Sequence, residues 1–440
     1  MKLVFGQQYR SESSEKPRLV PVERMQVALR CISLDGLLSA DHRARHLWAF
    51  VEQVDLSGVP QTKSVEGHGG RPAFDPRVLL ALWLYATSQG IGSARRLSDL
   101  CTSDLAYMWL CGDQTINAHT LSDFRRKGAE PLEKAMRSML VAMVASGNLE
   151  LHRVSQDGIK VRSHVGASSF RRKETLEKIQ KEVDQQMDRL RQEIDENPGS
   201  LTRREEAARQ CALRSRKRRV DEALDALKEI QKDLDRKAAK AKGKDRKPAK
   251  PREARASTTD AQARVMHMAD NGFRPAGNIQ FVTDTQTRLV VGVDVSHAGV
   301  DYGQMNPMLD VVERMTGRLP KELLVDGGYV SKQDIDAVAE RGVDVYAPIH
   351  NESKKEKPFE PKPKDSPAQA AWRKRMGEPE TAQIYKLRAA TSETVHADLR
   401  KHRGLQQFPV RGLDAMRAVA LLMALTYNAL IAISHGWVGA

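Results

Sequence analysis

The chain has 440 residues, of which 40% are apolar and 29% charged. A single small domain is excluded, because single hydrophobic cores stop growing at roughly 250 to 300 residues, and the apolar fraction excludes a wholly disordered chain. With 71 Lys and Arg against 57 Asp and Glu, the net charge is +14. This charge favours a polyanion such as nucleic acid as partner, while an acidic substrate or a lipid headgroup also fits.

The four cysteines form no CxxC pair, and the apolar run at the start of the sequence stops at Phe5. We therefore expect a protein of the reducing cytoplasm. The longest apolar stretch, 418–434, is interrupted by Thr426 and Asn428 and is shorter than the ~20 residues that a membrane span needs. It predicts a buried helix and no membrane partner.

Residues 1–148 predict an all-α N-terminal domain. A Gly- and Pro-rich loop at 67–76 precedes a helix that starts at Pro76, and the short helical segments 93–100, 103–110 and 117–127 each begin with Ser or Asn, which are good N-caps. The last segment ends in Arg125, Arg126 and Lys127. These cations are candidate phosphate contacts, although a helix C-terminus favours cations in any case.

Alternating apolar and polar residues indicate strands at 151–163, 277–284, 288–297, 321–330 and 344–350, with helical segments at 301–316 and 331–341. Strands that alternate with helices predict an α/β domain with a mixed sheet. We assign it to residues 149–167 and 263–440.

The segment 168–262 interrupts this domain. Leu176, Ile179, Val183, Met187, Leu190 and Ile194 follow one another at steps of three and four residues, which predicts a coiled-coil-like helix. The break at 197–200 and the apolar residues from Val220 to Leu234 predict a second helix, folded back as a helical hairpin. The basic, Pro-broken tract 237–255 predicts a flexible arm.

Two aspartates lie where strands end. Asp157 precedes Gly158, and Asp326 follows the apolar segment 322–325 and precedes Gly327. Ligands of α/β sheets gather at strand ends, and glycine lets a ligand approach closely. Each pair is equally a common Asp-Gly turn. Asp284 and Asp294 are rival acids that lack a following Gly-rich turn.

The segment 385–400 predicts a continuous helix that gathers an acid and cations on one face. At about 100° per residue, Glu393, His396 and Arg400 share a face, and Tyr385 and Arg388 complete it. A solvated, salt-bridged helix would have the same pattern. Tyr385 favours contact with another molecule.

Three motifs together resemble a known family. Asp157 in its Asp-Gly strand, Asp326 in VDGGY, and Y-x2-R-x4-E-x6-R from Tyr385 to Arg400 resemble the DDE transposases of bacterial insertion sequences, in the group with a Tyr-Arg-Glu-Lys signature. The segment from Gly70 through WLCGD and TLSDFRR is similar to the helical N-terminal domain of the same proteins. The resemblance covers 67–165 and 258–436.

The resemblance implies a ribonuclease H-like catalytic domain with Asp157, Asp326 and Glu393 as the catalytic, metal-binding triad. We expect Arg388, Arg400 and Lys401 to contact phosphates near the scissile bond, with Tyr385 as a further DNA-binding candidate. Arg400 stands where the signature usually has Lys, so a planar guanidinium group replaces a compact ammonium group of the same charge. Four residues separate Arg388 from Glu393, where some relatives have three.

Phosphoryl transfer on DNA explains why carboxylates are needed. Two Mg²⁺ ions roughly 4 Å apart stabilise the attacking and leaving oxygens, and three acids can hold them; Mn²⁺ can substitute. The sequence has no P-loop and no zinc-type Cys/His spacing, so we expect no nucleotide cofactor.

We therefore expect a transposase that binds double-stranded DNA, both at the terminal inverted repeats of its element and at a target, and that cleaves and joins strands. A homo-oligomer is expected when two ends are paired. Two alternatives stay open: an inactive DNA-binding protein derived from a transposase, and a non-transposing nuclease of the same fold.

Overall fold

The computed structural model describes residues 33–56, 73–197, 199, 202–241, 253–349 and 357–437. The expected loop at 67–76 and the expected basic arm at 237–255 lie largely outside these residues. The chain is a mixed α/β protein with a mixed sheet, as the alternation of strands and helices predicted.

The N-terminal part is helical, as expected. After a 3-10 turn, Asp35–Leu37, its helices are α1 (Arg43–Glu52), α2 (Pro76–Ser88), α3 (Ala94–Leu100), α4 (Leu105–Cys111), α5 (Ala118–Lys127) and α6 (Ala129–Ala145). Ser93 and Asn117 cap α3 and α5 as predicted. The cap of α4 is Asp104 and not Ser103, because the Asp104 carboxylate accepts the N–H groups of Ala106 and Tyr107.

The main sheet is built around β1. Its strands are β1 (Arg153–Arg162), β4 (Arg264–His267), β5 (Phe273–Asp284), β6 (Val290–Ser296), β7 (Glu322–Leu324) and β8 (Asp344–Tyr346). β1 is antiparallel to β5 and parallel to β7; β6 is antiparallel to β5, and β8 is parallel to β7. β4, which the sequence pattern missed, pairs with the start of β5, and Met266 is its one buried residue. The order is therefore β6-β5-β1-β7-β8, with β1 central.

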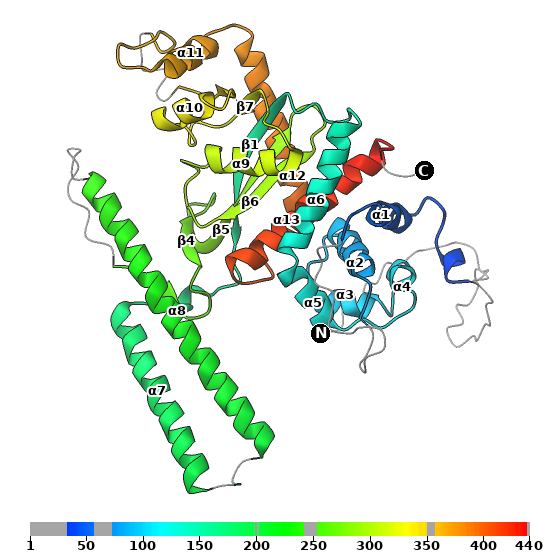
Figure 1. The fold of residues 1–440 in the computed structure, drawn as a ribbon, viewed down its shortest axis with the longest axis vertical. Coiled ribbons are helices and arrows are strands. Elements are labelled where there is room, and N and C mark those ends of the chain that lie inside the picture. Colours follow the sequence, from blue (N-terminus) through cyan, green and yellow to red (C-terminus); the bar gives the residue numbers. More distant parts are fainter. Residues whose placement is uncertain are drawn as a thin grey trace, which may run out of the picture.

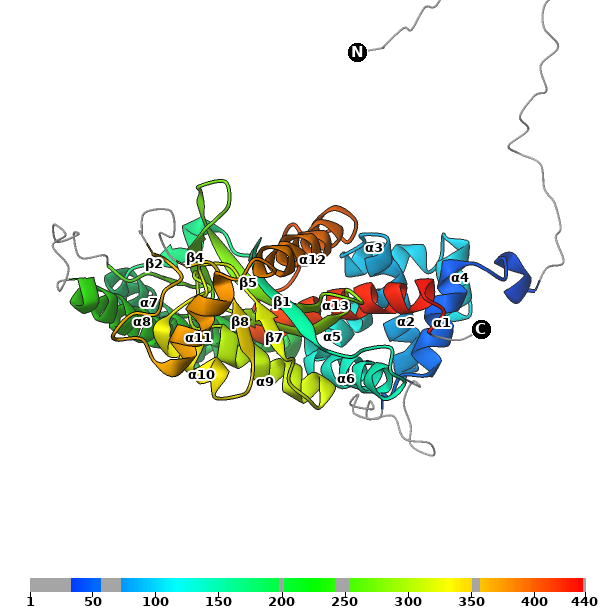
Figure 2. The ribbon, with the colours of Figure 1, turned by 90° about the horizontal axis from the view of Figure 1, so that it is seen from above.

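Helices cover both faces of this sheet (Figures 1 and 2). They are α9 (Met305–Thr316), α10 (Lys332–Ala339), α11 (Pro367–Met376), α12 (Thr381–Lys401) and α13 (Leu413–Ser434). Helix α13 packs closely on Gly277, since a Cβ added there would lie 3.2 Å from Met416. Helix α9 packs in the same way on Gly292, since a Cβ added there would lie 3.0 Å from Val312. The strand register puts these two glycines on opposite faces, so α13 and α9 pack on opposite sides. Of these five helices, only α11 lies in a segment for which the sequence pattern predicted no element.

Helix α13 contains the long apolar stretch. Among the described residues it alone is long and apolar enough to span a membrane, yet 78% of its most apolar window is buried within the protein. It packs against β6 and also against α1, α2, α5 and α6. The side chain of Asn428 accepts from the N–H of Val290 and donates to its carbonyl, both at 2.8 Å, which satisfies the edge of β6. The predicted buried helix is therefore confirmed.

Two long helices lie between β1 and β4 and project from the rest of the molecule (Figure 1). They are α7 (Lys173–Glu196) and α8 (Arg203–Ala241). Leu176, Val183 and Leu190 of the predicted seam are buried, and α8 is the helix that covers them. At the base, β2 (Phe170–Arg171) pairs antiparallel with β3 (Ala256–Ser257). Buried residues around Leu176 and Leu227 form a cluster separate from the main core.

Candidate active site

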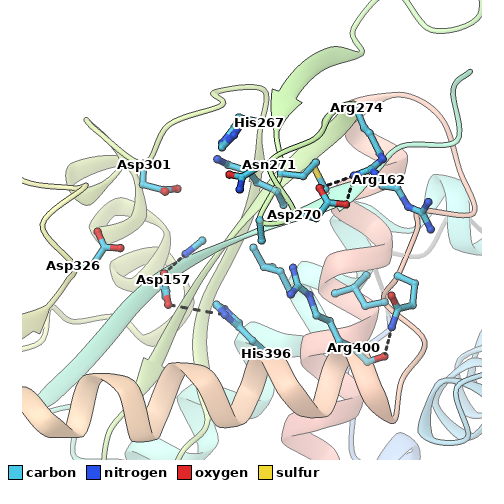
Figure 3. Close-up of a pocket in the computed structure, with 17 residues that line it drawn as sticks. Asp157, Arg162, His267, Asp270, Asn271, Arg274, Asp301, Asp326, His396 and Arg400 are labelled. Carbon is cyan, nitrogen blue, oxygen red and sulfur yellow. Dashed lines mark hydrogen bonds and ion pairs between the residues drawn. The ribbon is translucent and has the colours of Figure 1, made fainter. Parts of the chain in front are cut away.

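A cavity of about 740 Å³ lies along the free edge of β1 (Figure 3). β1 pairs with β7 only over Arg153–Ser155, although β1 itself continues to Arg162. Beyond the end of β7 the edge is therefore open, apart from a bridge between Arg162 and Gln407. The other walls come from the C-terminal half of α12 and from the turn between β4 and β5.

Asp157 lies on β1 at the acidic end of this cavity. Its Oδ1 accepts the N–H of Gly158 at 2.8 Å, and its Oδ2 faces α12. Gly158 is required by close packing: a Cβ there would lie 2.5 Å from both Asp301 Oδ1 and Gln280 Nε2. The Asp-Gly pair is therefore not a turn, because both residues belong to a paired strand.

Asp326 reaches the same cavity from the segment after β7. Its Oδ1 accepts the N–H of Gly328 at 2.7 Å, which forms a tight Asx-type turn. A Cβ on Gly328 would lie 2.9 Å from that oxygen, so the VDGGY motif needs glycine at this position. The structure thus brings together the two predicted aspartates from adjacent parallel strands.

The Asp157 carboxyl at the acidic end of the cavity has a shifted pKa. Burial raises the pKa of Asp157 to about 6; the N–H of Gly158 and Arg388 oppose the shift, and the charges of Asp326 and Asp301 add to it. Carboxylates that repel one another in a partly buried cavity are the environment that a bound cation would relieve.

Helix α12 supplies the groups that face Asp157. Arg388 Nη1 lies 3.4 Å from Asp157 Oδ2, and its buried Nε has no partner among the described residues. His396 Nδ1 lies 4.0 Å from the same oxygen. Burial, followed by Arg400 and Arg388, lowers the pKa of His396 to about 4, so the ring is neutral at neutral pH. The hydroxyl of Tyr385 donates to the carbonyl of Val325 at 3.1 Å, tying α12 to the residue before Asp326.

Glu393 does not join the two aspartates in this structure. It is exposed on α12 and does not line the cavity. Within the described ranges, no three His, Cys, Asp or Glu side chains are placed to hold a metal ion together. Its role in a three-acid site therefore stays a prediction.

The carboxylates that do converge fit a hard divalent cation. Mg²⁺ keeps several water ligands and often takes only one or two protein carboxylates, so Asp157 and Asp326 provide an adequate donor set. Burial, with a smaller contribution from the charges of Asp326 and Asp301, raises the pKa of Asp157, and a bound cation would oppose this shift.

The rest of the cavity lining contains four cationic side chains and one further carboxylate. Lys160 and Arg162 of β1, Arg274 of β5 and Arg400 of α12 line the cavity, and Arg274 pairs there with Asp270 at 2.6 Å. Lys401 is exposed next to Arg400 but does not line the cavity. A groove with carboxylates at one end and guanidinium and ammonium groups along its length suits a phosphodiester backbone.

The basic end of α5 divides into two kinds of residue. Arg125 is 5% exposed, donates to the carbonyl of Gly92 and lies 4.4 Å above the ring of Trp83. Burial lowers its pKa to about 10. These contacts contradict the expected phosphate contact of Arg125, because its guanidinium stabilises the fold. Arg126 and Lys127 are exposed and pair with Asp123 at 3.9 and 3.1 Å.

Sequence reasoning missed Asp301. It lines the cavity with Asp157 and Asp326 but follows β6 by five residues, so the rule of acids at strand ends did not find it. The rival acids lie elsewhere: Asp284 caps a turn through Thr287, and Asp294 pairs with Arg417 at 3.2 Å.

Two family models match the chain. One, described as "Transposase domain (DUF772)", matches residues 32–127, and the other, described as "Transposase DDE domain", matches residues 231–429. The second match includes Asp326 and Glu393 but begins after β1, so it does not cover Asp157. No curated protein and no solved structure matches the chain.

Proposed function

Because the chain belongs to the DDE transposases of insertion sequences, we propose that it binds the terminal inverted repeats of its own element, cleaves DNA strands there with Mg²⁺, and joins the freed ends to target DNA. The observation that carries this proposal is the groove along β1, where Asp157 and Asp326 lie at one end and Lys160, Arg162 and Arg400 follow along its length.

The sheet order supports a ribonuclease H-like catalytic domain. β1 is central, β5 and β6 are antiparallel on one side, and β7 and β8 are parallel on the other. In this proposal residues 149–167 and 263–440 perform the chemistry, residues 1–148 recognise the ends, and 168–262 assists pairing of two ends. The protein then acts in the bacterial cytoplasm, as a homo-oligomer when two ends are held.

Each group of residues has a defined task in this proposal. Asp157, Asp326 and Glu393 would hold the divalent ions, which supply charge neutralisation at the reacting phosphate and activate the attacking water or hydroxyl. Arg388 orients the Asp157 carboxylate. Arg400 contacts the phosphate backbone, and Lys401 extends the same basic surface. Tyr385 holds α12 against the segment that carries Asp326.

Strand cleavage tests the proposal. We expect Asp157→Asn, Asp326→Asn and Glu393→Gln each to abolish Mg²⁺-dependent cleavage of a labelled duplex that contains the element end, with binding in a mobility-shift assay retained. The control is Asp310→Asn, which removes a carboxylate of α9 that lies outside the cavity and pairs with Arg341. This variant should cleave normally. Normal cleavage by one of the three variants would remove that residue from the site.

The two alternatives have separate outcomes in the same assay. An inactive DNA-binding protein would shift the end duplex without cutting it in either Mg²⁺ or Mn²⁺. A non-transposing nuclease would cut the duplex, but no product that joins the freed 3′ end to a target plasmid would appear.

A further inference from the structure

Helix α8 is divided into a basic half and an acidic half. Residues 203–219 contain eight Lys and Arg and two Glu, whereas residues 220–236 contain three Lys and Arg and six Asp and Glu. The acidic half lies at the base of the projecting helices, because Ala223 and Leu227 pack in one cluster with Ala256 of β3. The basic half therefore belongs to the part of α8 that projects away from the sheet (Figure 1).

Ion pairs with α7 fix the orientation of the basic half. Arg209 lies 3.5 Å from Glu193, and Lys217 pairs with Asp184. Both acids belong to α7, so the side of α8 that carries Arg209 and Lys217 faces that helix. The other cations of residues 203–219 are free to lie on different sides of α8.

Five exposed arginines lie away from α7. They form an outer arginine row that consists of Arg203, Arg204, Arg214, Arg218 and Arg219. At about 100° per residue, Arg204, Arg214 and Arg218 fall within about 80° of one another, on the side of α8 opposite Arg209 and Lys217. At about 1.5 Å per residue the row is about 24 Å long, which equals roughly seven base pairs of duplex DNA.

The outer arginine row has few partners within the protein. Arg203, Arg204 and Arg219 have no hydrogen bond or ion pair among the described residues. Arg214 donates to the amide oxygen of Gln210 at 3.4 Å, and that oxygen carries no formal charge. Four of the five guanidinium groups therefore lack a carboxylate partner in the part of the chain that the structure describes.

The row also stands where cations disfavour the helix. Arg203 and Arg204 are the first two residues of α8, where the helix dipole has its positive end. Arg214 and Arg218 are four residues apart, and like charges at that spacing repel each other. The row is consequently unfavourable for α8 in the free protein, and a polyanion bound along it would remove both penalties.

The surroundings of the row favour a phosphate backbone over a protein partner. Ala207, Cys211 and Ser215 lie between the arginines, and their small side chains allow a close approach. Protein interfaces are usually anchored by large apolar or aromatic side chains, and none is exposed on the described part of α7 and α8. Guanidinium groups bind phosphate oxygens with two parallel hydrogen bonds.

We propose that the outer arginine row binds the phosphate backbone of double-stranded DNA, at a site separate from the groove along β1. This inference rests on the proposed function, because it names the partner of α7 and α8 in a protein that acts on DNA. Phosphate contacts hold and orient a duplex without reading its sequence. The row should therefore add affinity for any duplex that is long enough to reach α8 from the groove.

The salt dependence of DNA binding by the full-length protein tests the proposal. The variant combines Arg204→Gln, Arg214→Gln and Arg219→Gln, and the probe is a duplex that carries the element end with several helical turns of flanking DNA. The slope of log affinity against log salt concentration should fall by about 2 to 3, because each lost phosphate contact reduces it by about 0.9. Gln is a good helix former, so the circular dichroism of the variant should equal that of the wild type.

A matched control removes the same number of charges from the acidic half of the same helix. Lys228→Gln, Lys232→Gln and Arg236→Gln together should leave the slope unchanged, because Lys228 and Arg236 already pair with acids of α8. Replacing Arg204, Arg214 and Arg219 by Lys keeps the charges and should restore most of the wild-type slope. An equal fall for both Gln variants would mean that only net charge matters, and it would overturn the proposal.

The outcomes separate this inference from the proposed function. If the wild type cuts the end duplex in Mg²⁺ and the Arg-to-Gln variant keeps the wild-type slope, the row does not bind DNA and the proposed function stands. If that variant keeps the slope but loses self-association in analytical ultracentrifugation, the row contacts a second copy of the chain instead, which also overturns the proposal. If the slope falls but the wild type never cuts, the row binds DNA and the proposed cleavage is wrong.

Discussion

At the residue scale, Asp157 and His396 lie 4.0 Å apart, and their pKa values are shifted in opposite directions. The pKa of Asp157 is raised from 3.8 to about 6, and that of His396 is lowered from 6.5 to about 4, with burial as the largest cause of each. Asp157 therefore contributes stability that is present below about pH 4 and lost as pH rises to about 6. His396 contributes stability that is present above about pH 6.5 and lost as pH falls to about 4.

Because these two contributions oppose each other, single substitutions should separate them. In EDTA, the free energy of unfolding of Asp157→Asn should rise more steeply between about pH 4.5 and about pH 7 than that of the wild type, by on the order of 2 kcal/mol. His396→Gln should change the slope in the opposite direction. Urea unfolding at the two pH values measures both. Parallel profiles for all three proteins would contradict the assigned shifts.

Arg125 and Arg126 are adjacent in the sequence but should respond differently to the same substitution. Arg125→Met removes a buried charged hydrogen bond to Gly92 and should lower the free energy of unfolding by about 1–3 kcal/mol. Arg126→Met should change it by less than about 0.5 kcal/mol, because the side chain is exposed. If Arg126 contacts a phosphate, its loss should also reduce the slope of log affinity for DNA against log salt concentration by about 1. Equal stability losses in urea unfolding would contradict this division.

At the element scale, the helices α7 and α8 are connected to the rest of the chain in a way that allows their removal. Their buried residues form a cluster of their own, and Gln180 of α7 donates to Asp221 of α8 at 2.6 Å. At the base, Arg171 pairs with Ala256 in the antiparallel register. Two strand ends in this arrangement can be joined by a two-residue Asn-Gly turn.

Replacing residues 172–255 with Asn-Gly should leave the main core folded and Mg²⁺-dependent nicking of a single end intact. Cutting that requires two paired ends should be impaired, because we propose that the helices contact DNA or the second subunit. Gel analysis of one-end and two-end substrates, with circular dichroism as the folding control, measures this. Joining of two ends at the wild-type level would mean that these helices have no role in pairing.

At the scale of the whole molecule, the N-terminal helices and the sheet share one hydrophobic core. Helix α13 contacts α1, α2, α5 and α6 as well as β6. Glu133 of α6 pairs with Arg314 of α9 and Arg417 of α13, both at 2.6 Å. The functional division proposed at residue 148 therefore does not coincide with a division of the core.

The fragment 1–148 should consequently fold poorly by itself, since it would expose the apolar surface that α13 covers. We expect a non-cooperative thermal transition by circular dichroism and binding of a hydrophobic dye. A version in which residues 413–437 follow through a flexible linker should melt more cooperatively. Cooperative unfolding of the unmodified fragment would contradict this expectation, and end recognition could then be measured on the fragment directly.

The sequence by itself determined the features that depend on neighbouring residues. Ser93 and Asn117 mark helix starts because an N-cap acts within one turn, and the spacing from Leu176 to Ile194 indicates a helix because its period is local. The strand that contains Asp157 and the apolar helix that contains Asn428 were predicted on the same basis. Asp157 and Asp326 were identified as candidates because a motif can be compared without knowledge of its surroundings.

Only the tertiary structure decided which of these residues meet. The early end of β7 opens the edge of β1, so Asp157 and Asp326 share a cavity with Asp301, while Glu393 remains outside it. Arg125 is buried against Trp83, and its exposed neighbour Arg126 is not, although both belong to one basic run. Contacts between residues more than a hundred positions apart depend on how the elements pack, and a periodic pattern in one segment contains no information about the segment that will cover it.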